Sequence, residues 1–255
     1  MNNTNMFDVK NKKAIVTGGS RGLGYAMAEC LLEAGCSVVI IGSSDKVFEI
    51  ADNFKKRDLD CFAVKANLIK RDENYRAFNE SLELLGGDLD ILCTAAGIQK
   101  RHSAELFPIN EWDDVISINL NSVWILNQEA GKVMLKKGYG KIINVASMLS
   151  FFGGQTVPAY AAAKGGVAQL TKALNNDWAS RGINVNAIAP GYMDTDMNTA
   201  LVNNKERFEQ ISSRIPMKRW GTPQDMKGIT LFLSSHASDY ISGAIIPVDG
   251  GYLVK

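Results

Sequence analysis

The sequence predicts a single α/β domain, residues 1–255, built around one doubly wound parallel sheet. Short apolar runs alternate with longer segments in which apolar residues recur at helical spacing. This alternation favours parallel strands joined by right-handed crossovers, with helices on both faces of the sheet. The sequence contains no low-complexity tract, solenoid-type repeat or linker-like stretch, and its length suits one large α/β domain.

The first strand, turn and helix form the clearest local pattern. Lys13–Thr17 is an apolar run, and after a glycine-rich turn the apolar residues of Leu23–Ala34 follow helical spacing as far as Gly35. The run Ser37–Ile41 does not alternate with polar residues, which indicates a strand buried on both faces. Further strands are expected at Cys61–Lys65, Leu89–Thr94, Lys141–Val145, Asn184–Ile188 and Ala244–Val248, and further helices at Asp45–Lys56, Arg71–Leu85, Trp112–Lys136 and Tyr160–Ser180.

Composition and charge narrow the class of partner. The 28 basic and 27 acidic residues give a net charge of +1, too little to attract nucleic acid or an anionic membrane. No segment is apolar enough to cross a bilayer, and Met1–Lys13 lacks the apolar core of a signal peptide. The four cysteines form no CxxC pair and no metal-ligand pattern with histidine. We expect a soluble, cytoplasmic protein with buried thiols, no metal and a small-molecule substrate.

The turn Thr17–Gly24 reads TGGSRGLG and lies between the first strand and the first helix. Glycines in this context allow a tight turn and let a pyrophosphate approach the helix N-terminus, where free N–H groups and the helix dipole favour an anion. The alternative is a glycine-rich turn that binds nothing. The context favours a Rossmann-like dinucleotide site.

The end of the second strand bears on the choice between NAD and NADP. Many NAD enzymes place an acidic residue there to hold the ribose hydroxyls, whereas this chain has Gly42, Ser43 and Ser44. No carboxylate at these positions would repel a 2′-phosphate, and Arg21 and the two serines offer donors to it. The residues favour NADP, although Asp45 is close enough in sequence to act as a displaced acid.

Tyr160 and Lys164 stand four residues apart in a predicted helix, so their side chains share one face. A nearby ammonium favours the phenolate and lowers the pKa of a tyrosine, which makes such a pair a possible proton-transfer device. Ser147 follows the Lys141–Val145 strand and could hold the substrate oxygen, and Asn119 lies in a helical stretch. The alternative interpretation is a packed ring, a solvated lysine, a turn cap and a satisfied interior amide.

With these motifs and Pro190-Gly191 and Thr195 after the sixth strand, the chain resembles the short-chain dehydrogenase/reductase family from Lys13 to Tyr252. The resemblance implies that Tyr160 is the general acid/base, that Lys164 lowers its pKa and binds the nicotinamide ribose, and that Ser147 orients the substrate. It further implies that Asn119 holds a water that relays protons to Lys164. The cofactor would be bound by Gly18, Ser20, Arg21, Gly22, Leu23, Gly24, Ser43, Ser44, Asn67, Leu68, Ala96, Gly97, Tyr160, Lys164, Pro190, Gly191, Met193 and Thr195, and the substrate by Ser147, Met148, Tyr160 and Tyr192.

Two positions depart from the family's pattern. The family usually has Asn-Asn-Ala-Gly after the fourth strand, whereas Thr94-Ala95-Ala96-Gly97 stands here, which puts in doubt some stabilisation of the central strands. The acidic residue often found after the third strand is Asn67, whose amide can still bond to the adenine.

Within the family, the segments Ala146–Phe151 and Asn184–Met193 resemble sugar-acid dehydrogenases that act on compounds such as 2-dehydro-3-deoxy-D-gluconate. A carboxylate substrate calls for a basic side chain, and the candidates are Lys100, Arg101, His102, Arg214 and Arg219. The group commonly has an arginine where this chain has Thr156.

The sequence allows two other functions, and the family resemblance implies an oligomeric state. A pocket for acyl, steroid or other small ketones could be lined by aromatic and methionine side chains, and the alternative is that these side chains belong to the core. The residues concerned are Phe151, Phe152, Tyr192, Met193 and Met197. A function of another class is a dinucleotide-binding sensor without catalysis. The resemblance implies a homotetramer formed through the long central helices and the last strand, and Val123, Leu126, Val167, Leu170 and Leu174 could serve the core or that interface.

Overall fold

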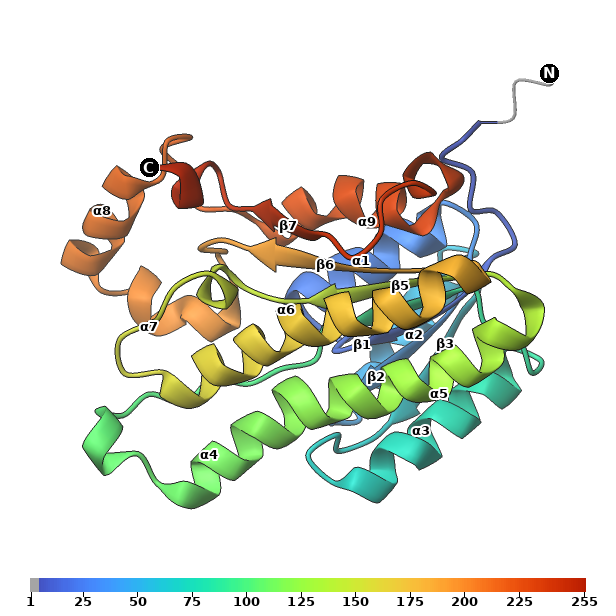
Figure 1. The fold of residues 1–255 in the computed structure, drawn as a ribbon, viewed down its shortest axis with the longest axis horizontal. Coiled ribbons are helices and arrows are strands. Elements are labelled where there is room, and N and C mark those ends of the chain that lie inside the picture. The colour runs from blue at the N-terminus through green and yellow to red at the C-terminus, as the bar shows by residue number, and fades with distance from the viewer. Residues whose placement is uncertain (1–4) are drawn as a thin grey trace.

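The computed structural model describes residues 5–255 and confirms the predicted α/β domain (Figure 1). Its single sheet has seven parallel strands in the order β3-β2-β1-β4-β5-β6-β7. The strand order reverses between β1 and β4, as in other doubly wound sheets. The strands are β1 Lys13–Thr17, β2 Ser37–Gly42, β3 Cys61–Lys65, β4 Ile91–Thr94, β5 Gly140–Val145, β6 Ile183–Pro190 and β7 Ile245–Val248.

Helices cover both faces of the sheet. The α-helices of the described residues are α1 Gly22–Glu33, α2 Lys46–Lys55, α3 Arg71–Leu84, α4 Ile109–Ile116, α5 Ser122–Lys137, α6 Pro158–Trp178, α7 Thr199–Val202, α8 Lys205–Arg214 and α9 Lys227–Ser234. One apolar cluster joins the sheet to α1, α2 and α9, and a second joins it to α3, α5 and α6. In Figure 1, α3, α5 and α6 lie in front of the strands.

Each central strand contributes apolar side chains to both layers. In β1, Ala14 and Val16 belong to the cluster under α1, whereas Ile15 between them belongs to the cluster under α5. All three are fully buried. This explains why the strand reads as a continuous apolar run instead of alternating, because both of its faces are covered.

The structure differs from the predicted elements mainly at their ends. The helix expected from Trp112 begins at Ile109 and contains a π-helical turn, Ser117–Asn121, between α4 and α5. The strand expected from Leu89 begins at Ile91, and the Asp90 carboxylate just before it accepts a hydrogen bond from the backbone N–H of Lys13. Helices α7, α8 and α9 were not predicted.

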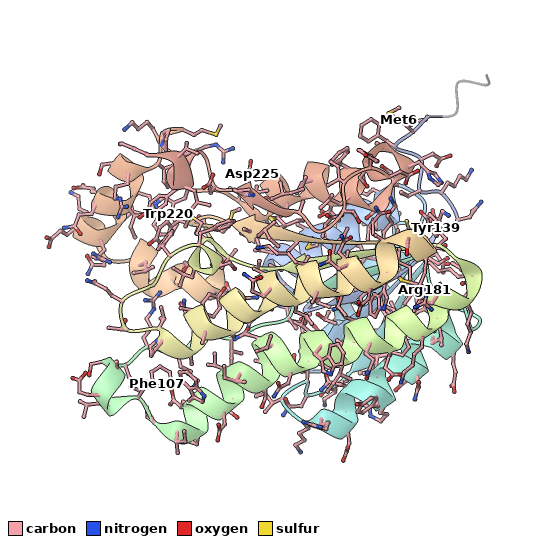
Figure 2. The ribbon with its side chains drawn as sticks, in the orientation of Figure 1. Met6, Phe107, Tyr139, Arg181, Trp220 and Asp225 are labelled. Carbon is pink, nitrogen blue, oxygen red and sulfur yellow. The ribbon has the colours of Figure 1, made fainter. Side chains whose placement is uncertain are left out.

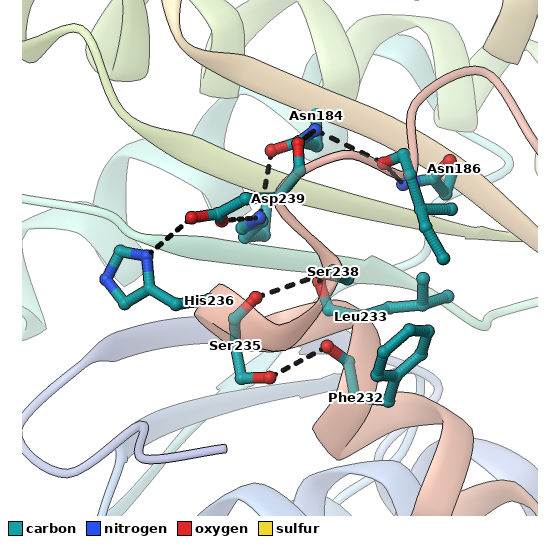
Figure 3. A network of polar contacts seen from close by, with 10 residues as sticks. Asn184, Asn186, Phe232, Leu233, Ser235, His236, Ser238 and Asp239 are labelled. Carbon is teal, nitrogen blue, oxygen red and sulfur yellow. Dashed lines mark hydrogen bonds and ion pairs between the residues drawn. The ribbon is translucent and has the colours of Figure 1, made fainter. Parts of the chain in front are cut away.

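An ion pair between a buried lysine and an exposed aspartate joins the C-terminal segment to the sheet, at the end where the strands begin. Lys141 of β5 is 1% exposed, and its Nζ lies 2.7 Å from Asp239 Oδ1 and 2.9 Å from Asn184 Oδ1. Figure 3 shows His236 on the other carboxylate oxygen of Asp239, and Asn186 bound to the same segment. Although burial opposes it, the bonds with Lys141 and His236 hold the pKa of Asp239 below its usual value.

The four cysteines are free thiols, as predicted, and all but Cys30 are buried. Burial raises the pKa of Cys36 and of Cys61 to about 12, so both are protonated at neutral pH. Between residues 5 and 255, the structure contains no cluster of His, Cys, Asp or Glu side chains arranged to hold a metal. Within the same range, no helix has the length and apolar character needed to cross a membrane.

Candidate active site

A cleft of about 860 Å³ opens where β1, β4, β5 and β6 end. It lies at the reversal of strand order, the position at which doubly wound sheets bind ligands. Residues predicted for the site that line it are Gly18, Ser20, Arg21, Gly22, Leu23, Gly24, Ser43, Leu68, Ala96, Gly97, Asn119, Ser147, Tyr160, Lys164, Pro190, Gly191, Met193 and Thr195. Four predicted residues do not line it: Ser44, Asn67, Met148 and Tyr192.

The glycine-rich turn has the geometry that a bound pyrophosphate requires. Gly18 and Gly22 have φ values of +68° and +56°, in the left-handed region that favours glycine. A Cβ on Gly24 would collide with the carbonyl oxygen of Gly18. Arg21, the N-cap of α1, makes no side-chain capping hydrogen bond, so the first-turn N–H groups remain available to an anion. The turn therefore fits a dinucleotide.

The end of the cleft near β2 contains Ser43 and Lys46. Lys46 was not predicted, because nothing in the sequence distinguishes a lysine that lines a cleft from a solvent-exposed lysine in the first turn of a helix. Arg21 forms an ion pair with Asp196 across the cleft, with 3.3 Å between Nη1 and Oδ2. Asp45, the candidate displaced acid, pairs with Lys65 at 2.8 Å and does not line the cleft.

The segment after β3 provides one wall of the cleft. Leu68 is buried and lines it, whereas Asn67 is exposed and its Oδ1 accepts a hydrogen bond from the backbone N–H of Ile69. Asn67 thus shapes the turn that presents Leu68.

Asn119 lies in the π-helical turn and is fully buried. Its Oδ1 accepts from Ile98 N at 3.1 Å and its Nδ2 donates to Ile98 O at 2.8 Å. The amide is therefore a satisfied interior group, but it retains a second N–H and a second lone pair that can bind a water.

Ser147 follows β5 in an extended conformation and caps the 3₁₀ turn Met148–Ser150. Its Oγ accepts a hydrogen bond from Leu149 N at 3.1 Å. Ser150, which was not predicted, donates from Oγ to the carbonyl oxygen of Lys164 at 2.7 Å. This bond joins the turn that carries Ser147 to the helix that carries Tyr160 and Lys164.

Tyr160 and Lys164 project from α6 into the cleft, as their spacing predicted. Burial raises the pKa of Tyr160 to about 12, and the contact with Ser147 and the charge of Arg101 act in the opposite direction. Lys164 is not among the groups that shift it, so in this structure the expected lowering of that pKa by Lys164 is not found. Burial instead lowers the pKa of Lys164 to about 8, and its Nζ donates to Val145 O at 2.6 Å.

Residues 194–198 after β6 line the cleft, and the mostly helical segment that follows them packs on a separate apolar cluster. Met148 packs there with Ile211 of α8, and Tyr192 packs on Trp220 and Tyr252. Trp220 lies at the same end of the molecule as Phe107 in Figure 2, opposite Tyr139 and Arg181. Met148 and Tyr192 thus pack against this segment and do not line the cleft. Of the other proposed pocket residues, Met193 and Met197 line the cleft, whereas Phe151 and Phe152 are exposed.

The basic residues proposed for a carboxylate have different surroundings. Arg219 is held by both oxygens of Asp225 at 2.7 Å, and Arg214 lies over the ring of Tyr252 at 4.7 Å. Lys100 and His102 both lie next to Glu111, with 3.8 Å from Lys100 Nζ to Oε1 and 2.9 Å from His102 Nε2 to Oε2. Arg101 hydrogen-bonds to the amide oxygen of Gln99 at 2.9 Å.

The departure at Ala95 is accompanied by other polar contacts between the central strands. Thr17 Oγ1 accepts a hydrogen bond from Ala96 N at 3.0 Å, which joins β1 to the turn after β4. Thr94 donates to Asn144 Oδ1 at 2.8 Å, and Asn144 in turn bonds to Asn127 and Thr171. These buried contacts connect β4 and β5 to α5 and α6.

Comparison with known proteins gives matches along almost the whole chain. The family described as enoyl-(acyl carrier protein) reductase matches residues 18–253. A Bacillus subtilis protein named 2-dehydro-3-deoxy-D-gluconate 5-dehydrogenase is 42% identical, over 98% of this chain and 97% of its own length.

Two crystal structures share the fold at lower identity. That of a gluconate 5-dehydrogenase from Burkholderia cenocepacia, in complex with NADP and tartrate, has a TM-score of 0.94 and 34% identity, and the match covers 98% of each chain. That of a short-chain type dehydrogenase/reductase from Mycobacterium marinum has a TM-score of 0.91 and 30% identity, again covering 98% of each chain. The cleft and these matches together show that the chain belongs to the short-chain dehydrogenase/reductase family of NAD(P)-dependent oxidoreductases.

Proposed function

We propose that the protein interconverts a secondary hydroxyl group and a ketone on a sugar acid such as 2-dehydro-3-deoxy-D-gluconate, with NADP(H) as the cofactor. The observation that carries the proposal is the convergence of Ser147, Tyr160 and Lys164 in a cleft that also contains the dinucleotide turn. A sensor without catalysis would have no use for a buried lysine beside a partly buried phenol in such a cleft.

The roles of the side chains follow from their positions. The bound nicotinamide supplies or accepts the hydride. Ser147 holds the substrate oxygen, and Tyr160 exchanges a proton with it. With a pKa of about 12, Tyr160 is protonated at neutral pH and can donate directly in the direction of ketone reduction. Lys164 and the remaining predicted cofactor residues hold the dinucleotide, and the free N–H of Asn119 is offered to a water that relays protons towards Lys164.

Arg101 is the residue we propose for the substrate carboxylate. Arg101 is exposed and directly follows Ile98, Gln99 and Lys100, which line the cleft. Its positive charge acts to lower the pKa of Tyr160, against the larger effect of burial. An arginine binds a carboxylate through two parallel hydrogen bonds. The names of the Bacillus and Burkholderia relatives, which refer to sugar acids, support this assignment.

The preference for NADP rests on the charges near β2. Ser43 and Lys46 line that end of the cleft, Arg21 lies in the neighbouring glycine-rich turn with its guanidinium on Asp196, and Asp45 is turned to Lys65. Two cations and a hydroxyl suit a 2′-phosphate. The NADP in the Burkholderia structure supports the same choice.

We also propose a homotetramer in the cytoplasm. Family resemblance supports the assembly, and the four free thiols suit a reducing compartment.

The test is turnover followed by nicotinamide absorbance, with both cofactors and a panel of sugar acids, acetoacetyl compounds and steroid ketones. We expect turnover of sugar acids. If the protein instead turned over acetoacetyl compounds or steroid ketones and no sugar acid, it would be a reductase of those ketones. Tyr160→Phe should lower turnover by about 100- to 10,000-fold while NADP binding stays close to normal. The control is Tyr240→Phe, since that ring is fully exposed. Near-normal turnover by Tyr160→Phe would refute the mechanism.

A further inference from the structure

We propose that Glu111 is a positioning residue for substrate recognition, which holds the loop Ile98–His102 so that Arg101 faces the substrate. We call this segment the recognition loop. The inference rests on the proposed function, because it takes Arg101 as the residue that binds the substrate carboxylate.

The first end of the recognition loop is fixed by Asn119. The amide of Asn119 pairs with both backbone groups of Ile98, at 3.1 Å and 2.8 Å. The amide is fully buried, so neither bond competes with solvent. The backbone just before Gln99 therefore has a defined position relative to the π-helical turn.

The other end is fixed by His102. Its backbone N–H donates to Thr156 O at 3.0 Å, and its Nε2 lies 2.9 Å from Glu111 Oε2. Its ring meets the ring of Phe107 edge to face, with 5.2 Å between the centroids. Figure 2 shows Phe107 beside α4, the helix that contains Glu111.

Glu111 has a second partner in the same loop. Its Oε1 lies 3.8 Å from Lys100 Nζ, so the two carboxylate oxygens contact the residues on either side of Arg101. The bond with His102, and to a smaller extent the charge of Lys100, hold the pKa of Glu111 below its usual value. The carboxylate is therefore charged at neutral pH and can make both contacts.

Glu111 and Asn119, whose side chains hold the two ends of the recognition loop, belong to one continuous helical segment formed by α4 and the π-helical turn. Arg101 itself bonds only to Gln99 among the described residues, which leaves donors of its guanidinium for a ligand. A loop fixed on both sides of a binding residue loses less conformational freedom when the ligand binds. Glu111 thus supplies preorganisation without touching the substrate.

The kinetic test compares Glu111→Ala and His102→Ala with Glu105→Ala, an exposed glutamate of the neighbouring 3₁₀ turn. We expect the first two variants to raise KM for a sugar acid about tenfold, with kcat within about twofold of wild type and NADP affinity unchanged. KM for an uncharged polyol or ketone should not change. Equal effects on the charged and uncharged substrates, or no effect on KM, would overturn the inference.

Limited trypsin digestion tests the loop without any substrate. Glu111→Ala should be cleaved after Lys100 or Arg101 at least about fivefold faster than wild type or Glu105→Ala, because local opening exposes the bond. Unchanged cleavage would overturn the inference. If wild type does not turn over sugar acids, the proposed function fails, whereas the digestion still decides whether Glu111 holds the loop.

Discussion

Ser43 and Ser44 follow β2 directly, but only Ser43 lines the cleft. A carboxylate at position 43 would face the proposed 2′-phosphate, and two such charges about 4 Å apart repel by about 1 to 4 kcal/mol. We expect Ser43→Asp to raise KM for NADP relative to NAD about tenfold or more, and Ser44→Asp to leave the ratio unchanged. Steady-state kinetics with both cofactors measures it. If Ser43→Asp and Ser44→Asp had the same ratio of KM for NADP to KM for NAD, Ser43 would not face the 2′-phosphate.

Position 42 is less suitable for that test. A Cβ on Gly42 would lie 3.1 Å from Val47 Cβ and 3.2 Å from Ser20 Oγ. A loss of NADP affinity in Gly42→Asp would therefore combine charge repulsion with a displaced helix.

Lys164 is buried with its ammonium bound to one carbonyl, and this should cost stability. Its pKa is about 8 in the folded protein and about 10.4 in an unfolded chain. Below pH 8 both states carry the proton, so the whole cost of burying the charge is present. Between pH 8 and 10.4 the unfolded state binds more protons, so this cost decreases as pH rises.

Lys164→Met should therefore lose activity and gain about 1 kcal/mol or more in the free energy of unfolding at pH 7. The substitution also leaves the carbonyl oxygen of Val145 without its hydrogen bond. A net gain in stability therefore requires that burying the charge costs more than losing this bond. Chemical denaturation of both proteins from pH 7 to 10 measures it, and the difference between them should narrow above pH 8. A difference that does not depend on pH would contradict the buried-charge explanation.

At the scale of elements, the sequence predicted what has strong periodicity. The apolar strands β1, β2 and β5 and the helix α6 lie within a few residues of their expected bounds, because buried faces impose the pattern. The short, mostly polar α8 was missed, since it buries only Ile211 and so has little apolar periodicity. The π-helical turn was missed because an extra residue in a helix leaves both flanking patterns intact.

Much of the site was predictable and its connections were not. Gly18, Ser147 and Tyr160 follow from local context, because turn chemistry and helical spacing act over a few residues. The contacts of Ser150 with Lys164 and of His102 with Glu111 depend on how separate elements pack. From the spacing of Tyr160 and Lys164 we expected a lowered pKa for the tyrosine, but burial raises it. Spacing along a helix carries no information about burial, so the sequence could not predict this effect.

The ion pair between Lys141 and Asp239 connects β5 to the segment before β7 and allows an element-scale test. Lys141 is buried, whereas the Asp239 side chain is more than half exposed, and Lys141 keeps Asn184 as a second partner. Breaking the pair should therefore cost less than in a fully buried pair, and about as much as losing one hydrogen bond to a charged group, about 1.5 to 3 kcal/mol. Asp239→Ala should lower the free energy of unfolding by that amount, and Lys141→Met/Asp239→Ala should recover part of it. A double-mutant cycle by urea denaturation measures the coupling, and strictly additive effects would contradict the pairing.

The same pair should respond to acid. Asp239 has a folded pKa below its unfolded value, so its contribution is complete above the unfolded pKa and is lost as pH falls through the folded one. The urea midpoint of wild type should fall in that range by more than that of Asp239→Ala.

At the scale of the whole molecule, the proposed homotetramer needs an exposed apolar surface. Val123, Leu126, Val167 and Leu174 are buried within one chain, and Leu170 packs against the core, so these side chains belong to the fold and not to an interface. Trp124 of α5 points outward instead and is 41% exposed. A large aromatic residue on a long outer helix is the kind of side chain that anchors protein interfaces.

Trp124→Glu should therefore shift the protein to smaller assemblies, because a charge would be buried at a contact that normally buries an indole. Phe48→Glu is the matched control, since Phe48 is 45% exposed on α2, which packs on the other face of the sheet. Sedimentation velocity at several concentrations measures the mass of each variant beside wild type. A wild-type tetramer that persists in Trp124→Glu would place the interface elsewhere, and a monomeric wild type would refute the assembly. Because the cleft lies within one chain, the smaller species should still bind NADP.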